Sequence, residues 1–249
     1  MNFRRQNYAR RTAESQAGFF LPHLKPGMAL LDLGCGPGSI TVGLAERVAP
    51  GPTVGFDQIP GLPEGTDSPT ITLVTGDALD LPFPAESFDA IFSSAMLQHV
   101  GDPLAALVEV RRVARPGAVI GLVDADWDGQ LLYPTNPLLE RSLEIMALLR
   151  SGTSPYVGKR LRSLLHEAGF VRCESTARAV HHGTPAEVAG VGAFTGSLLA
   201  RPEAVETVTA QGWATASELE VMVQAWNEWA AEPGAFLARF WCEALAWVP

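Results

Sequence analysis

The sequence is poor in cysteine. Cys35, Cys173 and Cys242 are the only three in 249 residues, and they lie far apart without a CxxC pair. An odd number of widely spaced cysteines argues against the disulfide frameworks of small secreted domains and against zinc sites built from paired ligands. We therefore expect no bound metal, and we expect a protein of the reducing cytoplasm.

Basic residues and long apolar runs are scarce as well. Lys and Arg total 18 against 27 Asp and Glu, for a formal net charge of −9, which repels the phosphate backbone of a nucleic acid. No stretch reaches the roughly 18 uninterrupted apolar residues of a membrane span. Residues 1–21 carry two arginine pairs and lack the apolar run of a signal peptide. Neither a nucleic acid nor a membrane is expected as a partner.

Hydrophobic residues make up 47% of the chain, and their order is informative. Between about residues 25 and 125, apolar runs of strand length alternate with segments whose apolar residues recur every three or four positions. This alternation predicts βαβ units and an α/β, Rossmann-like, doubly wound sheet, mostly parallel, with helices on both faces. The expected strands are 29–33, 53–57, 71–75, 88–93 and 118–124, and the expected helices are 10–24, 40–48 and 103–113.

After residue 125 longer helical segments take over. We interpret residues about 126–150 and 184–235 as a helical cap, the second part inserted between the last two strands, 171–180 and 236–248. With these strands the sheet is expected to have seven. The chain is then a single domain, residues 1–249, whose cofactor-binding core is about 25–125.

The strongest motif is a glycine-rich loop, LDLGCGPGS, between the first expected strand and the next helix. Glycines let the chain turn sharply and bring bare backbone against a ligand, beside the unpaired N–H groups of a helix N-terminus. Gly34, Gly36 and Gly38 have the spacing GxGxG, whereas dinucleotide binders use GxGxxG and would need glycine at Ser39. The loop favours a ligand with an amino-acid moiety and a ribose but no pyrophosphate. A tight turn without a ligand is the alternative.

Acidic residues follow the next two expected strands. Asp57 stands about 20 residues beyond the glycine loop, where a carboxylate can accept hydrogen bonds from both ribose hydroxyls. Asp77 follows the third strand, where it can accept from an adenine amino group while the N–H of Ala78 donates to a ring nitrogen. The alternatives are a surface turn for Asp57 and a helix N-cap for Asp77.

The fourth expected strand ends in Ser93 and Ser94. Ligands of open α/β sheets bind outside the carboxyl ends of the strands. We therefore expect Ser94 near an ammonium group of the ligand, and residues 96–99 on the ligand side of the sheet.

The runs LLDLGCGPGSIT, GFDQ, GDALDLPFPAESFDAIFSSAMLQHV and VRRVARPGAVI occur in that order. Together they resemble the class I S-adenosylmethionine methyltransferases, and within them the branch named for the ubiquinone and menaquinone C-methyltransferases. The resemblance covers residues 8 to about 125. It implies S-adenosylmethionine as cofactor and a small-molecule acceptor, which the name of the branch does not identify because the branch serves many methylations.

The resemblance also implies a role for each motif. The glycines lie against the methionine part, Asp57 holds the ribose with Gln58 beside the adenine, and an arginine fork suits the carboxylate of the cofactor. For Arg11 a solvated helix charge is the alternative. The cofactor-binding residues implied are Tyr8, Arg11, Gly34, Gly36, Gly38, Asp57, Gln58, Asp77, Ala78 and Ser94.

No catalytic base is assigned. His99 is the histidine nearest the cofactor motifs, but an LQHV run that opens a helix is more typical of a packed structural residue. All six tryptophans lie beyond residue 125, so the cap is expected to line an apolar or aromatic acceptor site. Trp226 and Trp229, three apart on one helix face, are more typical of core packing. The other histidines considered are His23, His166, His181 and His182.

Two other functions stay open. A nucleotide-dependent oxidoreductase is opposed by Ser39, which stands where the third glycine would be. A non-catalytic S-adenosylmethionine-binding protein would be marked by broken cofactor motifs, and the motifs are intact. The sequence leaves open the methylated atom and whether the chain forms a homodimer.

Overall fold

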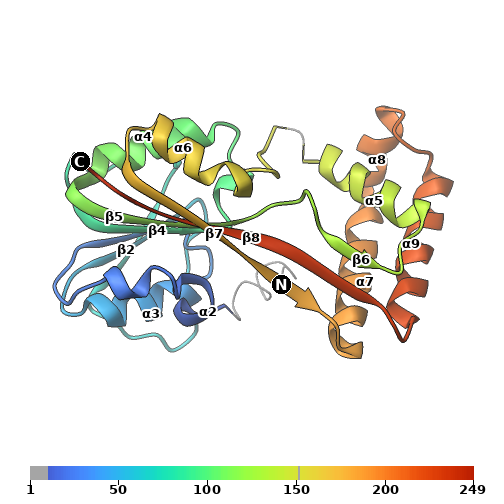
Figure 1. Ribbon diagram of the computed structural model, residues 1–249, viewed down its shortest axis with the longest axis horizontal. Coiled ribbons are helices and arrows are strands. Elements are labelled where there is room, and N and C mark those ends of the chain that lie inside the picture. The colour runs from blue at the N-terminus through green and yellow to red at the C-terminus, as the bar shows by residue number, and fades with distance from the viewer. Residues whose placement is uncertain (1–10, 151) are drawn as a thin grey trace. The chain divides into compact units, whose positions relative to one another are not determined.

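The computed structural model describes residues 11–150 and 152–249 (Figure 1). The chain divides into two compact units. The first runs to Ala125 and also contains Tyr156–Arg178 and Trp241–Pro249, and the second contains Asp126–Pro155 and Ala179–Phe240. The two segments predicted to form a cap therefore belong to one unit.

The sheet confirms the predicted α/β class. The strand order is β3-β2-β1-β4-β5-β8-β6, with β7 paired to β8, and the first five strands are parallel. β8 runs antiparallel to both β5 and β6. The strands are β1 Leu30–Leu33, β2 Thr53–Asp57, β3 Ile71–Thr75, β4 Phe88–Ser94, β5 Ala114–Ala125, β6 Leu131–Tyr133, β7 Val171–His182 and β8 Phe236–Trp247.

Eight strands replace the seven expected from the sequence. The additional strand is β6, which pairs with β8 from Leu131↔Ala238 to Tyr133↔Phe236. Three residues between loop segments are too few to show the alternation by which a strand is recognised. The pairing with β8, and not the local pattern, makes this segment a strand.

Helices cover both faces of the sheet in the first unit (Figure 1). The central strands are buried on both sides and alternate between two cores. Leu31 of β1 and Ile91 of β4 face the core under α4 and α6, whereas Leu30 and Phe92 face the core under α2 and α3. These helices are α2 Ala13–Ala17, α3 Ser39–Val48, α4 Pro103–Val113 and α6 Leu161–Glu167.

The single helix expected over residues 10–24 is wrong. The structure has the short helix α2 and a separate 3-10 turn, Leu21–His23, with the N–H of Phe20 donating to the carbonyl of Ala17. Pro22 has no N–H with which to continue an α-helical ladder, and its ring clashes with the preceding turn. The capping box of Thr12 and Ser15 starts α2, and the proline prevents its extension.

The second unit is helical and has its own core. Trp226 is fully buried and its Nε1 donates to Ser142 Oγ at 2.8 Å. Trp229 donates to the carbonyl of Tyr133 at 3.1 Å, and the two indole rings meet edge to face at 5.3 Å. Core packing of both tryptophans is thereby confirmed. The helices of this unit are α5 Pro137–Leu148, α7 Pro185–Leu199, α8 Pro202–Ala210 and α9 Ala216–Ala231.

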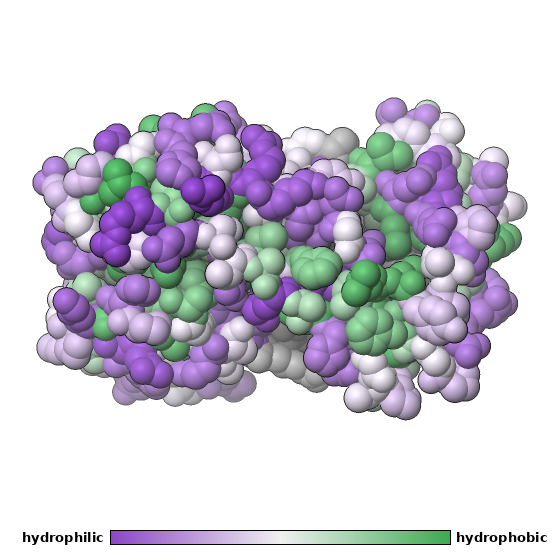
Figure 2. Space-filling model, in the orientation of Figure 1, coloured by the Kyte–Doolittle hydropathy of each residue, from purple (hydrophilic) through white to green (hydrophobic). Residues whose placement is uncertain are grey.

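Apolar side chains gather on part of the face of the second unit that Figure 2 draws. Figure 2 shows apolar side chains over β6 and the adjoining part of β8, where Leu131 and Phe236 are exposed. None of the helices in residues 11–150 and 152–249 combines the length and the apolar composition that crossing a bilayer requires.

Candidate functional site

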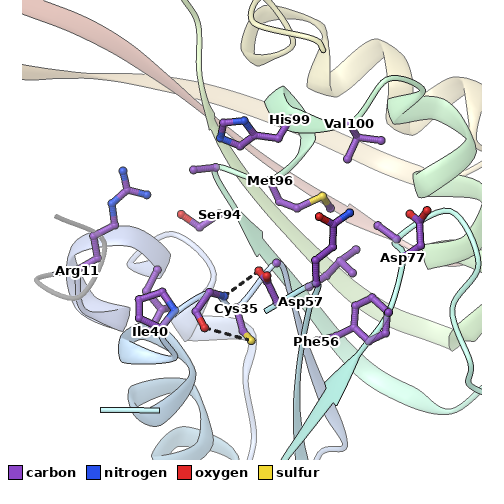
Figure 3. A pocket seen from close by; sticks show the side chains of 18 of the residues that line it. Arg11, Cys35, Ile40, Phe56, Asp57, Asp77, Ser94, Met96, His99 and Val100 are labelled. Carbon is purple, nitrogen blue, oxygen red and sulfur yellow. Dashed lines mark hydrogen bonds between the residues drawn. The ribbon is translucent and has the colours of Figure 1, made fainter. Parts of the chain in front are cut away.

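A cavity of about 270 Å³ opens at the carboxyl ends of β1 to β4 within the first unit (Figure 3). This is the edge at which open α/β sheets bind ligands. Eight of the ten residues predicted to bind a cofactor line it: Arg11, Gly34, Gly36, Asp57, Gln58, Asp77, Ala78 and Ser94. Tyr8 lies outside the described residues, and Gly38 is not among the lining residues.

The loop between β1 and α3 is held against the end of β2. The N–H groups of Gly34 and Cys35 donate to the carbonyl of Phe56 at 2.7 and 3.1 Å. The N–H of Gly36 donates to Asp57 Oδ2 at 3.0 Å, and Oδ1 of the same carboxylate accepts from the N–H of Ile59 at 2.9 Å. Asp57 thus fixes the loop, while each of its oxygens keeps a further lone pair for a ligand.

Gly36 and Gly38 have different structural reasons to be glycine. Gly36 has φ +52°, and a Cβ built there meets no protein atom within 4 Å. Gly38 has φ +75° and is the N-cap of α3, where a Cβ would lie 2.2 Å from the carbonyl oxygen of Gly61. Gly36 therefore borders open space, and Gly38 allows two backbone segments to approach. The expectation that all three glycines face a ligand does not describe Gly38.

Asp77 is not a helix N-cap, the alternative considered from the sequence, because a turn and not a helix follows it. Its Oδ1 accepts from the N–H of Leu79 at 3.0 Å, and its carbonyl accepts from the N–H of Asp80 at 3.1 Å. The side chain thus stabilises a turn, and it also lines the cavity together with Ala78. Oδ2 has no hydrogen-bond partner among the described residues and remains available to a ligand.

The end of β4 contributes the opposite wall. Ser94 Oγ is buried, lines the cavity and has no hydrogen-bond partner among the described residues. Ala95 follows in a left-handed conformation, φ +57°, with its N–H donating to the carbonyl of Val123 at 2.8 Å. A non-glycine residue in this conformation is uncommon and concentrates at functional sites. The turn directs Met96 and His99 to the cavity as well (Figure 3).

Two titratable groups at the glycine loop are buried, the carboxyl of Asp32 and the thiol of Cys35. Asp32 is buried and accepts from Thr41 Oγ1 at 2.6 Å. Burial raises the pKa of Asp32 to about 7, and the nearby charge of Asp57 acts in the same direction. Burial, aided by Asp32 and Asp57, also raises the pKa of the Cys35 thiol. Cys35 is therefore a neutral thiol at physiological pH and not a thiolate nucleophile.

Arg11 is positioned by the neighbouring strands. Its guanidinium carbon lies 4.7 Å from the centre of the Trp241 ring. Arg178 Nε bonds Glu243 Oε1 at 2.9 Å, and its Nη2 bonds Gln16 Oε1 at 3.1 Å, which ties α2 to β7 and β8. Figure 3 shows Arg11 and Asp77 at opposite ends of the cavity with Asp57 between them.

Sequence reasoning missed the apolar lining of the cavity. Ile40 opens α3, Phe56 is the buried residue before Asp57, and Val100 follows the turn that carries His99. Each of the three is next to a recognised motif. In a sequence, however, an apolar residue that lines a cavity looks the same as an apolar residue in the core. No signal in one sequence separates the two.

The polar groups that line the cavity fit S-adenosylmethionine. Asp57 and Asp77 offer acceptors for hydroxyl and amino groups, and Arg11 carries a guanidinium that suits a carboxylate. Ser94 Oγ is a buried polar atom without a hydrogen-bond partner in the described part of the chain. Within the described part of the chain, no group of three or more His, Cys, Asp or Glu side chains could hold a metal ion.

Comparison with known sequences agrees with this geometry. A family described as "Methyltransferase domain" matches residues 31–122. The chain is 31% identical to an uncharacterized methyltransferase of Schizosaccharomyces pombe, over 67% of this chain and 65% of that protein's length. It is 31% identical to the probable methyltransferase ltbC of Aspergillus luteorubrus, over 95% of this chain and 91% of that protein. It is 30% identical to a demethylmenaquinone methyltransferase of Staphylococcus aureus, over 59% of this chain and 70% of that protein.

Among solved structures, the fold is similar to phosphoethanolamine N-methyltransferase 2 of Haemonchus contortus, which was solved with S-adenosylhomocysteine and phosphomonomethylethanolamine. The TM-score is 0.54 at 18% identity, over 90% of this chain and 49% of that one. A similarity at this level of identity shows the fold alone.

Proposed function

Because the chain belongs to the class I S-adenosylmethionine-dependent methyltransferases, we propose that it transfers a methyl group from S-adenosylmethionine to a small-molecule acceptor. The observation that carries the proposal is the cavity at the carboxyl ends of the parallel strands. It brings into one space the open face of Gly36, the carboxylates of Asp57 and Asp77, and the hydroxyl of Ser94, which has no hydrogen-bond partner among residues 11–150 and 152–249.

The cofactor would lie along the line from Arg11 to Asp77. Asp77 and Ala78 would bind the adenine edge, with Gln58 beside it, and Asp57 would accept from the ribose hydroxyls. Gly34, Gly36 and Ser94 would surround the methionine part, whose carboxylate would reach the Arg11 guanidinium. The sulfonium of the bound cofactor supplies an electrophilic methyl group, and the protein supplies orientation and exclusion of water.

The acceptor is proposed to be apolar or aromatic and to be bound with the help of the second unit. One observation supports this assignment: the second unit exposes the apolar side chains of Leu131 and Phe236. A methyl donor must be shielded from water while it reacts, so a cap has a physical purpose.

The proposal also includes a cytoplasmic location, and it assigns no catalytic base. The cysteines Cys35, Cys173 and Cys242 are buried and form no disulfide with one another, which suits the reducing cytoplasm. His99 lines the cavity, but no observation assigns it a proton transfer, so no catalytic base is proposed.

Calorimetric titration tests the cofactor assignment. S-adenosylhomocysteine should bind one site per chain, and NADH should not bind. Binding of NADH in its place would favour the oxidoreductase and contradict the proposal.

A screen of small-molecule acceptors with S-adenosylmethionine labelled in the methyl group tests the transfer. Label in an apolar or aromatic product is the expected result. Hydrogen exchange measured with the accepted compound then tests the cap. Protection confined to segments of the first unit would refute a role for the second unit.

A further inference from the structure

Asp124 is a buried carboxylate at the carboxyl end of β5, and the proposed cofactor contacts do not use it. It is 2% exposed, belongs to the same unit as the cavity, and is not one of the residues that line the cavity. Burial of a carboxylate is unfavourable unless hydrogen bonds compensate for the lost water. The hydrogen bonds that Asp124 accepts therefore indicate what it holds in place.

One of these bonds reaches the turn that forms a wall of the cavity. Asp124 Oδ2 accepts from the N–H of Gln98 at 3.2 Å. Gln98 is the second residue of the 3-10 helix Leu97–His99, and the first N–H groups of a helix have no partner inside it. The residue before this helix is Met96, whose thioether is a weak acceptor and makes no capping bond. A carboxylate 26 residues further along the chain supplies the cap instead.

β5 holds the same turn at a second point. The N–H of Ala95, which has the left-handed φ of +57°, donates to the carbonyl of Val123 at 2.8 Å. Two consecutive residues of β5 thus fix the chain directly before Met96 and directly after Leu97. The position of the turn is set by the end of the neighbouring strand.

The turn in its place decides where three lining side chains lie. Met96, His99 and Val100 all line the cavity (Figure 3). Met96 also packs on the glycine loop, since a Cβ built on Gly34 would lie 2.5 Å from Met96 Cγ. A displaced turn would therefore change one wall of the cavity and the packing of the loop opposite.

We propose that Asp124 is a positioning residue of the methyl-transfer site, and that it acts through the N–H of Gln98 on the wall formed by Met96, His99 and Val100. The inference rests on the proposed methyl transfer and adds to it a residue that does not line the cavity. Without this bond the turn populates other arrangements, and the apparent affinity for the cofactor falls in proportion to the fraction of molecules that keep the binding arrangement.

Asp124→Ala removes the bond, and Asp89→Ala is its matched control. Asp89 also accepts from a backbone N–H, that of Ala29 at 2.8 Å, but at the amino ends of β4 and β1, away from the cavity. In calorimetry of the full chain, Asp124→Ala should raise the dissociation constant of S-adenosylhomocysteine by about fivefold, the factor that corresponds to one capping hydrogen bond. Asp89→Ala should leave it unchanged, although both variants lose stability.

NMR of the methionine methyl groups in the ligand-free chain gives a readout that a loss of stability alone does not move. Asp124→Ala should shift the methyl signal of Met96 and leave that of Met28 in place. Asp89→Ala should do the reverse, because Met28 precedes Ala29, whose N–H bonds Asp89. The replacements Met28→Leu and Met96→Leu assign the two signals.

A conservative variant covers the case in which Asp124→Ala does not fold. In the wild type both oxygens of Asp124 accept, Oδ2 from Gln98 and Oδ1 from the N–H of Ala125 at 3.2 Å. Asp124→Asn keeps only one oxygen and should shift the Met96 signal in the same direction by a smaller amount.

The inference is overturned by an unchanged Met96 signal in a folded Asp124 variant, or by equal affinities of Asp124→Ala and Asp89→Ala for S-adenosylhomocysteine. Failure of wild type to bind S-adenosylhomocysteine contradicts the methyltransferase proposal instead. The Met96 signal is measured without ligand, so it still decides whether Asp124 positions the turn.

Discussion

Replacement of Gly36 by alanine should separate ligand binding from folding. A Cβ at this position meets no protein atom within 4 Å, so the methyl group has room in the absence of ligand. The cost to the fold comes from φ +52°, a left-handed conformation that costs an alanine about 1–2 kcal/mol. We expect the free energy of unfolding to fall by about that amount.

The effect on binding should be larger, because Gly36 lines a cavity of about 270 Å³ that the cofactor must share with the new methyl group. Overpacking by one methyl group costs roughly 1–3 kcal/mol. The dissociation constant of S-adenosylhomocysteine should therefore rise by about tenfold to hundredfold. Calorimetric titration measures this change, and denaturant unfolding of the ligand-free protein measures the change in stability.

Two other glycines provide controls. Gly65 has φ +78° and also no protein atom within 4 Å of a built Cβ, but it does not line the cavity. Gly65→Ala should match Gly36→Ala in stability and match wild type in binding. At Gly38 a Cβ would lie 2.2 Å from Gly61 O, so Gly38→Ala should destabilise the fold more than either. The reasoning is refuted if folded Gly36→Ala binds S-adenosylhomocysteine as tightly as Gly65→Ala does.

Three further predictions concern named side chains. Asp57→Ala should raise the dissociation constant of S-adenosylhomocysteine more than Asp77→Ala, because Asp57 is proposed to accept from two ribose hydroxyls and also accepts from the N–H of Gly36 at 3.0 Å. At about 1.5–3 kcal/mol per hydrogen bond to a charged group, the factor should be at least about tenfold. The reverse order in calorimetry would contradict the assignment of Asp57 to the ribose. Burial raises the pKa of Asp32 to about 7, so between about pH 4 and 7 the folded state holds a proton that the unfolded state releases. The free energy of unfolding should therefore fall as pH rises through this range, by up to about 4 kcal/mol. Chemical unfolding at pH 5 and pH 8 should show this decrease in wild type and not in Asp32→Asn. Trp226→Phe removes the bond to Ser142 Oγ in the core of the second unit and should lower the free energy of unfolding by about 2–4 kcal/mol. An unchanged denaturation midpoint would show that the indole contributes little to that core.

The elements that the sequence predicted well are those decided by local preferences. Parallel strands buried on both faces appear as short apolar runs, and the GxGxG loop after the first of them places backbone N–H groups beside a helix N-terminus. Because all carboxyl ends of parallel strands lie at one edge, Asp57, Asp77 and Ser94 could be expected in one cavity before the fold was known. The break of the first helix at Pro22 was also readable in principle, since proline lacks an N–H.

Other features depend on contacts between distant segments, and no local pattern contains them. Three residues become β6 only because β8 pairs with them, and Gly38 faces the backbone of Gly61 instead of the cavity. The raised pKa of Asp32 is a consequence of burial. Side-chain preferences act over a few neighbouring residues, whereas desolvation and the choice of partners are set by packing of the whole chain. The sequence by itself therefore determined the class of cofactor, and the tertiary structure decided which of the predicted residues line the cavity.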